Sequence, residues 1–152
     1  MSGTITTRTF KDVERLLEEN PGLKTIEMIK VPGSANDESN LKASRLIRNA
    51  GIDIHVPKGG YIASGGVDFF CAGITRTAHE DSYFGVHSWA DDKVESAHTL
   101  PKEHPDHQIF LDYYREMDIP DDFYWFTLRS AIASEMYNMS PNERVQYGLI
   151  KK

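Results

Sequence analysis

Ser64 is the residue whose surroundings most favour covalent chemistry. It lies in the run GYIASGG at residues 60–66, between a Gly-rich loop and an apolar segment. A serine attacks a carbonyl group efficiently only when a base takes its proton and when N–H donors stabilise the oxyanion that forms. A helix that begins near Gly65 would offer free backbone N–H groups at that point. The alternative is that Ser64 only caps this helix.

His87 is the candidate base, within the run FGVHSW at residues 84–89. A lone histidine at the end of a strand is usually a structural residue. It becomes a general base only if the fold brings its ring within hydrogen-bond reach of the Ser64 hydroxyl.

Other chemistries find little support in the sequence. His98, His104 and His107 lie close together, but Pro105 interrupts a regular helical pair and no His-Glu-x-x-His motif is present. Gly-x-x-x-x-Gly-Lys and Gly-x-Gly-x-x-Gly are also missing from the sequence, so we expect no metal and no cofactor. Cys71 is the single cysteine, which excludes an intrachain disulfide, and its apolar neighbours predict an inert buried residue.

The hydrophobic pattern predicts alternating helices and strands around these residues. Such alternation is typical of an α/β fold with a mainly parallel sheet. We expect a helix at 38–49 capped by Asp37 or Ser39, and a capping box at Ser140 and Glu143 that opens a last short helix. The other expected elements are helices at 10–19, 67–73, 107–117 and 123–133, strands at 25–31, 52–56 and 82–89, and a loop at 90–105.

Length and charge narrow the class of protein. A chain of 152 residues predicts a single domain over 1–152. The net charge of −6, with no basic run, argues against nucleic-acid binding, and no apolar run is long enough to span a membrane. The polar start of the chain lacks signal-peptide features, which predicts a cytoplasmic protein as written, with a periplasmic one left open if a signal was removed.

Four motifs in order carry a resemblance to a known family. They are the turn Pro32-Gly33-Ser34, the loop GYIASGG, the helix end AGITR at 72–76 and the strand SYFGVH at 82–87. The ending MSPNERVQYGLI at 139–150 also looks like the family pattern Leu-Ser-x-x-Glu-Ala-x-x-Tyr-Gly-Leu-Val. Over residues 23–150 the chain resembles the Clp protease proteolytic subunit, within the Clp/crotonase superfamily.

The resemblance implies a crotonase-type ββα superhelix and assigns roles to matching positions. Ser64 would be the nucleophile and His87 the general base. Backbone N–H groups near Gly33 or Ser34 and at Gly65 would form the oxyanion hole.

The family's acid falls just before the Met139-Ser140 motif. Counting back without a gap reaches Met136, and the nearest carboxylate is Glu135, which the resemblance therefore implies as the third member of the site.

The resemblance further implies a peptide or protein substrate and a homo-oligomer. The chain is shorter than a typical Clp subunit, which argues against an unfoldase ATPase partner. Two other functions stay open at this point. The chain could be a non-catalytic scaffold or binding subunit, or a crotonase-like enzyme acting on acyl-CoA thioesters with Asp68 as its carboxylate.

Overall fold

The computed structural model describes residues 1–151 and divides the chain into two compact units. The first unit is Met1–Tyr83, and the second begins at Phe84. The expectation of a single domain over 1–152 stays a prediction. In the part of the chain that the structure describes, no helix combines the length and the hydropathy that crossing a membrane requires.

The strands of the first unit pair in parallel. β1 (Thr25–Glu27), β3 (Asp53–Val56) and β5 (Arg76–Ala78) form a three-stranded sheet in the order β1-β3-β5. β2 (Lys30–Val31) pairs in parallel with β4 (Tyr61–Ala63). The prediction of an α/β fold with mainly parallel pairing is confirmed, although β4 and β5 were not expected.

The single strand expected at 25–31 is in fact two strands. The Met28 N–H still donates to the His55 carbonyl, at 2.8 Å, and so continues the ladder between β1 and β3. One residue further along the chain, the Ile29 carbonyl accepts from the Tyr61 N–H of β4 at 2.9 Å. The chain therefore changes partner strand between these two residues, which alternation of apolar side chains does not reveal.

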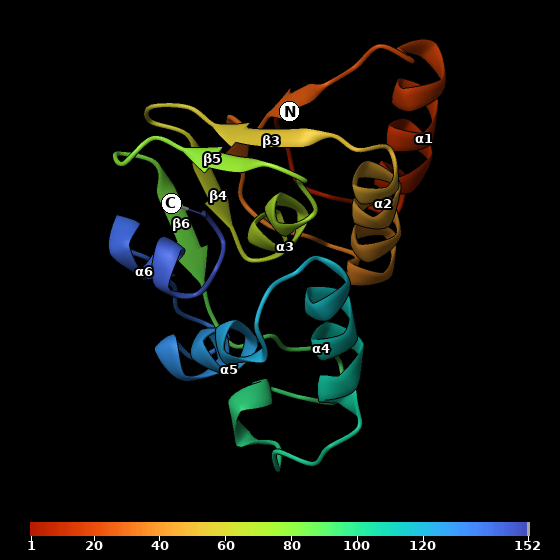
Figure 1. Ribbon diagram of the computed structural model, residues 1–152. Coiled ribbons are helices and arrows are strands. Elements are labelled where there is room, and N and C mark those ends of the chain that lie inside the picture. The colour runs from red at the N-terminus through yellow and green to blue at the C-terminus, as the bar shows by residue number, and fades with distance from the viewer. Residues whose placement is uncertain (152) are drawn as a thin grey trace. The chain divides into compact units, whose positions relative to one another are not determined.

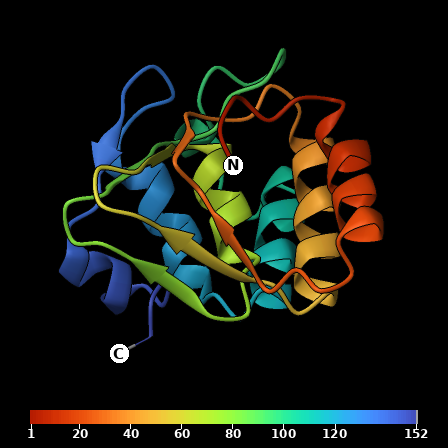
Figure 2. The ribbon, with the colours of Figure 1, turned by 90° about the horizontal axis from the view of Figure 1, so that it is seen from above.

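Three helices accompany these strands: α1 (Thr9–Glu19), α2 (Asp37–Asn49) and α3 (Gly65–Cys71). α1 and α2 lie side by side (Figure 1), and the view from above shows the same arrangement (Figure 2). The cap of α2 is Asn36, rather than Asp37 or Ser39, because its side chain accepts from the Ser39 N–H at 2.8 Å.

The start of α3 packs directly on the backbone of β2. A methyl group added at Gly66 would lie 2.3 Å from the Val31 carbonyl oxygen. One added at Gly65 would lie 2.3 Å from the Ser34 Cβ. Both distances are shorter than van der Waals contact, so this packing requires glycine at both positions.

The second unit contains the remaining elements. β6 (Tyr83–Val86) begins at the last residue of the first unit and pairs antiparallel with β7 (Tyr137–Asn138), with Gly85 opposite Asn138. The helices are η1 (Ala97–Thr99), α4 (Asp106–Glu116), α5 (Asp121–Ser130) and α6 (Pro141–Gln146).

Two sequence predictions in the second unit have clear outcomes. The capping box is confirmed, because Ser140 Oγ accepts from the Glu143 N–H at 3.3 Å while the Glu143 carboxylate accepts from the Ser140 N–H at 2.8 Å. The helix expected at 123–133 instead ends at Ser130, because Ala131 is extended with φ −156° and ψ 149°. Residues 131–136 therefore form a loop.

The core of the second unit is aromatic. Tyr124 is 1% exposed, and its hydroxyl lies 2.6 Å from His107 Nδ1 and 2.8 Å from Trp89 Nε1. His107 Nε2 lies 3.1 Å from the Pro101 carbonyl oxygen, so both ring nitrogens are bonded within the protein. His107 is thus a structural residue that ties α4 to α5.

We expect Gly66→Ala to destabilise the first unit severely, by about 2–4 kcal/mol, because its methyl group has no space beside Val31. Urea denaturation followed by circular dichroism measures this change. Gly22→Ala is the matched control, since a methyl group there meets no atom within 4 Å. Equal midpoints for the two variants would contradict the close packing of α3 on β2.

Candidate functional site

Ser64 occupies a sharp turn between β4 and α3. Its backbone has φ 52° and ψ −126°, a positive φ that residues with a side chain seldom adopt. A conformation of this kind costs about 1–3 kcal/mol and persists only where the surrounding structure enforces it. Here β4 enters the turn and the tightly packed α3 leaves it, so the strain falls on the serine itself. A strained strand-to-helix turn is also how other hydrolases expose a nucleophilic serine.

The Ser64 side chain does not cap α3. The backbone carbonyl of Ser64 accepts from the Val67 N–H at 2.8 Å and from the Asp68 N–H at 3.3 Å, whereas its hydroxyl makes no capping hydrogen bond. Ser64 therefore occupies the N-cap position, but its side chain does not accept a hydrogen bond from the first turn of α3. This disfavours capping as the role of the side chain.

The residues expected at the oxyanion hole gather around Ser64. A methyl group at Gly33 would lie 3.8 Å from the Ser64 Cβ, and one at Gly65 would lie 3.1 Å from the Ser34 backbone nitrogen. The Gly65 N–H belongs to the first turn of α3 and has no acceptor within the helix. Ile5 holds the turn in place, because its N–H donates to the Gly33 carbonyl at 3.0 Å.

Asn40, on α2, supports this arrangement and was missed in the sequence. Its side-chain Nδ2 donates to the Gly65 carbonyl at 2.9 Å, and the residue is fully buried. Among residues 1–151, its Oδ1 has no hydrogen-bond partner. The available signal was a polar residue on the apolar face of a predicted helix, at the spacing of Ala43 and Ile47.

His87 follows β6 in the second unit and is half-buried. Its Nδ1 lies 2.9 Å from the Ala133 carbonyl oxygen. A carbonyl oxygen can only accept, so Nδ1 must carry the proton of this hydrogen bond. In the neutral ring Nε2 then holds the lone pair, which is the state that a general base requires.

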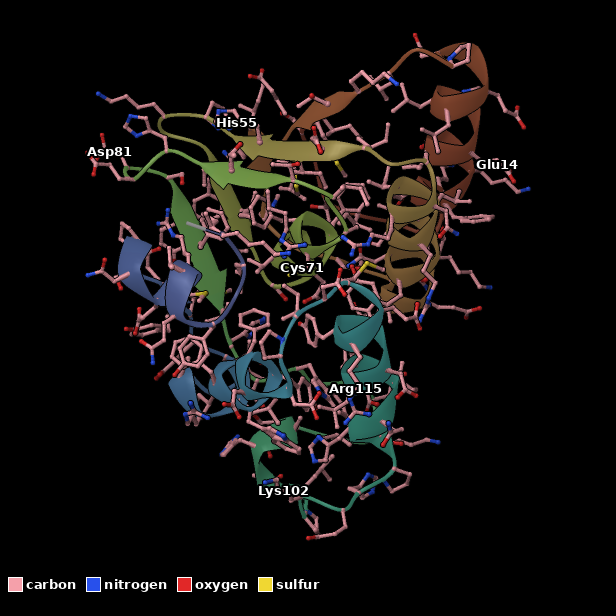
Figure 3. All side chains as sticks on the ribbon, viewed as in Figure 1. Glu14, His55, Cys71, Asp81, Lys102 and Arg115 are labelled. Carbon is pink, nitrogen blue, oxygen red and sulfur yellow. The ribbon has the colours of Figure 1, made fainter. Side chains whose placement is uncertain are left out.

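Glu135 is the residue expected as the third member of the site. It is exposed in the loop after α5, where its N–H donates to the Ile132 carbonyl at 3.0 Å. Its side chain lines a pocket of about 730 Å³ together with Lys102, Trp125 and Arg129. Figure 3 labels Lys102, which lies in the segment between η1 and α4. The role of Glu135 as the partner of His87 stays a prediction. The Ala133 carbonyl is an alternative partner, because it already lies 2.9 Å from His87 Nδ1.

The structure thus groups the site residues in two sets. Ser64, Gly33, Ser34 and Gly65 lie together in the first unit, whereas His87 and Glu135 belong to the second. The pairing of Ser64 with His87 stays a prediction.

The remaining candidate for chemistry near the loop is Asp68. Asp68, the carboxylate nearest the loop, lies half-buried on α3. Within residues 1–151, no group of three or more His, Cys, Asp or Glu side chains is arranged to hold a metal ion.

Solved structures share the fold of this chain over 99% of its length. One is the 1510-N membrane-bound stomatin-specific protease, as a lysine-to-alanine mutant in complex with a substrate peptide (14% identity, TM-score 0.64, 71% of that chain). A serine-to-alanine mutant of the same protease matches with 14% identity and a TM-score of 0.66 over 75% of that chain. The ClpP protease catalytic domain from Plasmodium falciparum matches with 17% identity and a TM-score of 0.62 over 80% of that chain.

The chain therefore has the ClpP/crotonase fold, which it shares with the catalytic domains of serine proteases. This confirms the fold that the sequence resemblance implied. No protein-family model matches the chain, and no curated protein is significantly similar in sequence. At 14–17% identity the structural match defines the fold, and the chemistry must be argued from the site residues.

Cys71 lies at the end of α3 and is fully buried (Figure 3). We expect it to take no part in chemistry. Burial raises the pKa of its thiol to about 12, against a smaller opposing effect of the nearby Arg76. Since the thiolate is the reactive form, the folded protein holds almost none of it at neutral pH.

We expect Cys71 to resist a disulfide reagent such as DTNB in the folded protein at pH 8 and to react fully in denaturant. Absorbance at the wavelength of the released thiolate measures both states. Rapid modification of the folded protein would show that this part of the first unit opens, or that the thiol is not buried.

Proposed function

We propose that this protein is a Clp-like serine peptidase with Ser64 as nucleophile and His87 as general base. The observation that carries the proposal is the positive φ of Ser64 at a strand-to-helix turn, with a hydroxyl that caps nothing in α3. Strain of this kind, kept in a well-packed fold, is typical of functional residues.

The proposed mechanism is acyl transfer in two stages. His87 Nε2 takes the proton from Ser64 as its Oγ attacks the peptide carbonyl carbon, and the N–H groups of Gly65 and Ser34 stabilise the oxyanion. The imidazolium of His87 then returns the proton to the leaving amine, and the C–N bond breaks. A water molecule, deprotonated by His87, hydrolyses the acyl-enzyme and regenerates the serine.

The choice of a peptide substrate rests on the structural neighbours. They are proteases, and one of them is seen in complex with a substrate peptide. The cleaved sequence, self-assembly into a homo-oligomer and the cellular compartment stay predictions.

The contact to Ala133 also shapes the expected rate. A neutral carbonyl can fix the tautomer of His87 but stabilises the imidazolium less than a carboxylate does. We therefore propose a slow peptidase, whose acylation is detected more readily with a reactive probe than by turnover.

We expect a fluorophosphonate probe to label the wild-type protein at Ser64, with the site identified by peptide mass spectrometry. Ser64→Ala should abolish labelling, and His87→Ala should slow it by more than about a hundredfold, because the serine then lacks its base. Ser134→Ala is the matched control, since this serine is exposed in a loop, and it should label at the wild-type rate.

Cleavage of a peptide library by wild-type protein, absent in Ser64→Ala, would extend the result from acylation to peptidase activity. A folded wild-type protein that neither labels nor cleaves would instead favour the non-catalytic scaffold.

A further inference from the structure

A chain of hydrogen bonds in the second unit leads away from His87, and we call it the Ser96 network. His87 Nδ1 lies 2.9 Å from the Ala133 carbonyl oxygen, and the Ala133 N–H donates to Ser96 Oγ at 3.2 Å. Ser96 Oγ lies 2.7 Å from His98 Nδ1. The backbone N–H of His98 donates to Ser88 Oγ at 2.8 Å, which returns the network to the residue after His87.

The atoms at Ala133 fix the direction of its two hydrogen bonds. The Ala133 N–H can only donate, so Ser96 Oγ is its acceptor. The hydrogen bond between Ser96 Oγ and His98 Nδ1 takes either direction, according to the tautomer of His98. At the other end, the Ala133 carbonyl can only accept, so His87 Nδ1 is the donor. Ala133 is therefore bonded through both its N–H and its carbonyl.

The position of Ala133 in the Ser96 network depends on the Ser96 side chain, which accepts its N–H. It is only 6% exposed, whereas Ala133 lies in the loop 131–136 that follows α5 and precedes β7. A loop carbonyl has no ladder of hydrogen bonds to hold its direction. A second tie joins the same segments, because the Ser88 N–H donates to the Ala131 carbonyl at 2.9 Å. Within the loop, the Glu135 N–H also donates to the Ile132 carbonyl at 3.0 Å, which closes a turn around Ala133. Ser96 is the side chain that bonds Ala133 itself.

We propose that Ser96 is a positioning residue, which holds Ala133 so that its carbonyl keeps the proton of His87 on Nδ1 and leaves the lone pair on Nε2. A buried serine and a loop carbonyl together thus replace the orienting part of an acid. The structural part of this inference concerns only His87 and its tautomer, whereas its catalytic consequence rests on the proposed function.

The first experiment reads the tautomer directly, by the imidazole ¹⁵N chemical shifts of His87 at a pH where the ring is neutral, with His87→Gln to assign the signals. In the wild-type protein we expect the Nδ1–H form to dominate. In Ser96→Ala we expect a mixture of the two tautomers. Ser96→Thr keeps a hydroxyl and should restore the wild-type shifts, and Ser134→Ala, in the same loop as Ala133, should leave them unchanged.

The second experiment measures fluorophosphonate labelling of Ser64 against pH in the same variants. We expect Ser96→Ala to lower the maximal rate about tenfold and to alter the shape of the profile, because fewer His87 rings present the lone pair on Nε2. Ser96→Thr should recover most of the rate. Probe affinity, from the concentration dependence of the rate, should change little, which separates positioning from a loss of binding.

The outcomes separate this inference from the proposed function. A tautomer change in Ser96→Ala with no labelling of wild-type Ser64 would support the role of Ser96 and remove the peptidase. If wild-type Ser64 is labelled, and Ser96→Ala has the same His87 shifts and labelling rate as the wild-type protein, the proposed function would be supported and the role of Ser96 would be removed. If Ser96→Ala does not fold, the wild-type spectrum still decides, because a dominant Nε2–H form would overturn the proposal.

Discussion

The first turn of α3 approaches the backbone of β2 and the turn after it more closely than any residue with a side chain permits. Gly65 and Gly66 make this contact possible, and the rest of the candidate site depends on it. Because α3 begins so close to Val31 and Ser34, the chain leaving β4 must bend sharply, and Ser64 bears the strained backbone. A methyl group added at Gly65 would lie 3.1 Å from the Ser34 backbone nitrogen, so the two residues proposed for the oxyanion hole are close neighbours. The close packing of α3 and the strained backbone of Ser64 therefore have one origin.

A backbone carbonyl is the hydrogen-bond partner of His87 Nδ1. An aspartate in a triad fixes the tautomer of the histidine and also stabilises its positive charge. The Ala133 carbonyl, at 2.9 Å from Nδ1, supplies the first of these effects fully and the second only weakly. Glu135, two residues along the same loop, is one of the residues that line a pocket, together with Lys102 and Arg129. The role of Glu135 as the acid stays a prediction, and function must be argued from the residues placed on the fold.

Sequence patterns predicted the long helices and the strands between them, because apolar spacing over ten or more residues leaves few alternatives. The capping box at Ser140 was equally readable, since it is a local pattern of two residues. Short elements were missed: β4, β5 and β7 each contain two or three residues, too few to show a period. The strand at 25–31 was read as one because its alternation is continuous, although its hydrogen-bond partner changes from β3 to β4.

The sequence alone determined the α/β fold class and the position of Ser64 between a Gly-rich loop and an apolar helix. These features are encoded by residue types at short spacing, so no contact between distant segments is needed to see them. Only the tertiary structure decided that Ser64 carries a positive φ, that Asn40 donates to the Gly65 carbonyl, and that the Ala133 carbonyl lies 2.9 Å from His87 Nδ1. Each of these depends on segments that are far apart in the chain and on a backbone atom or angle, and one-letter patterns record neither.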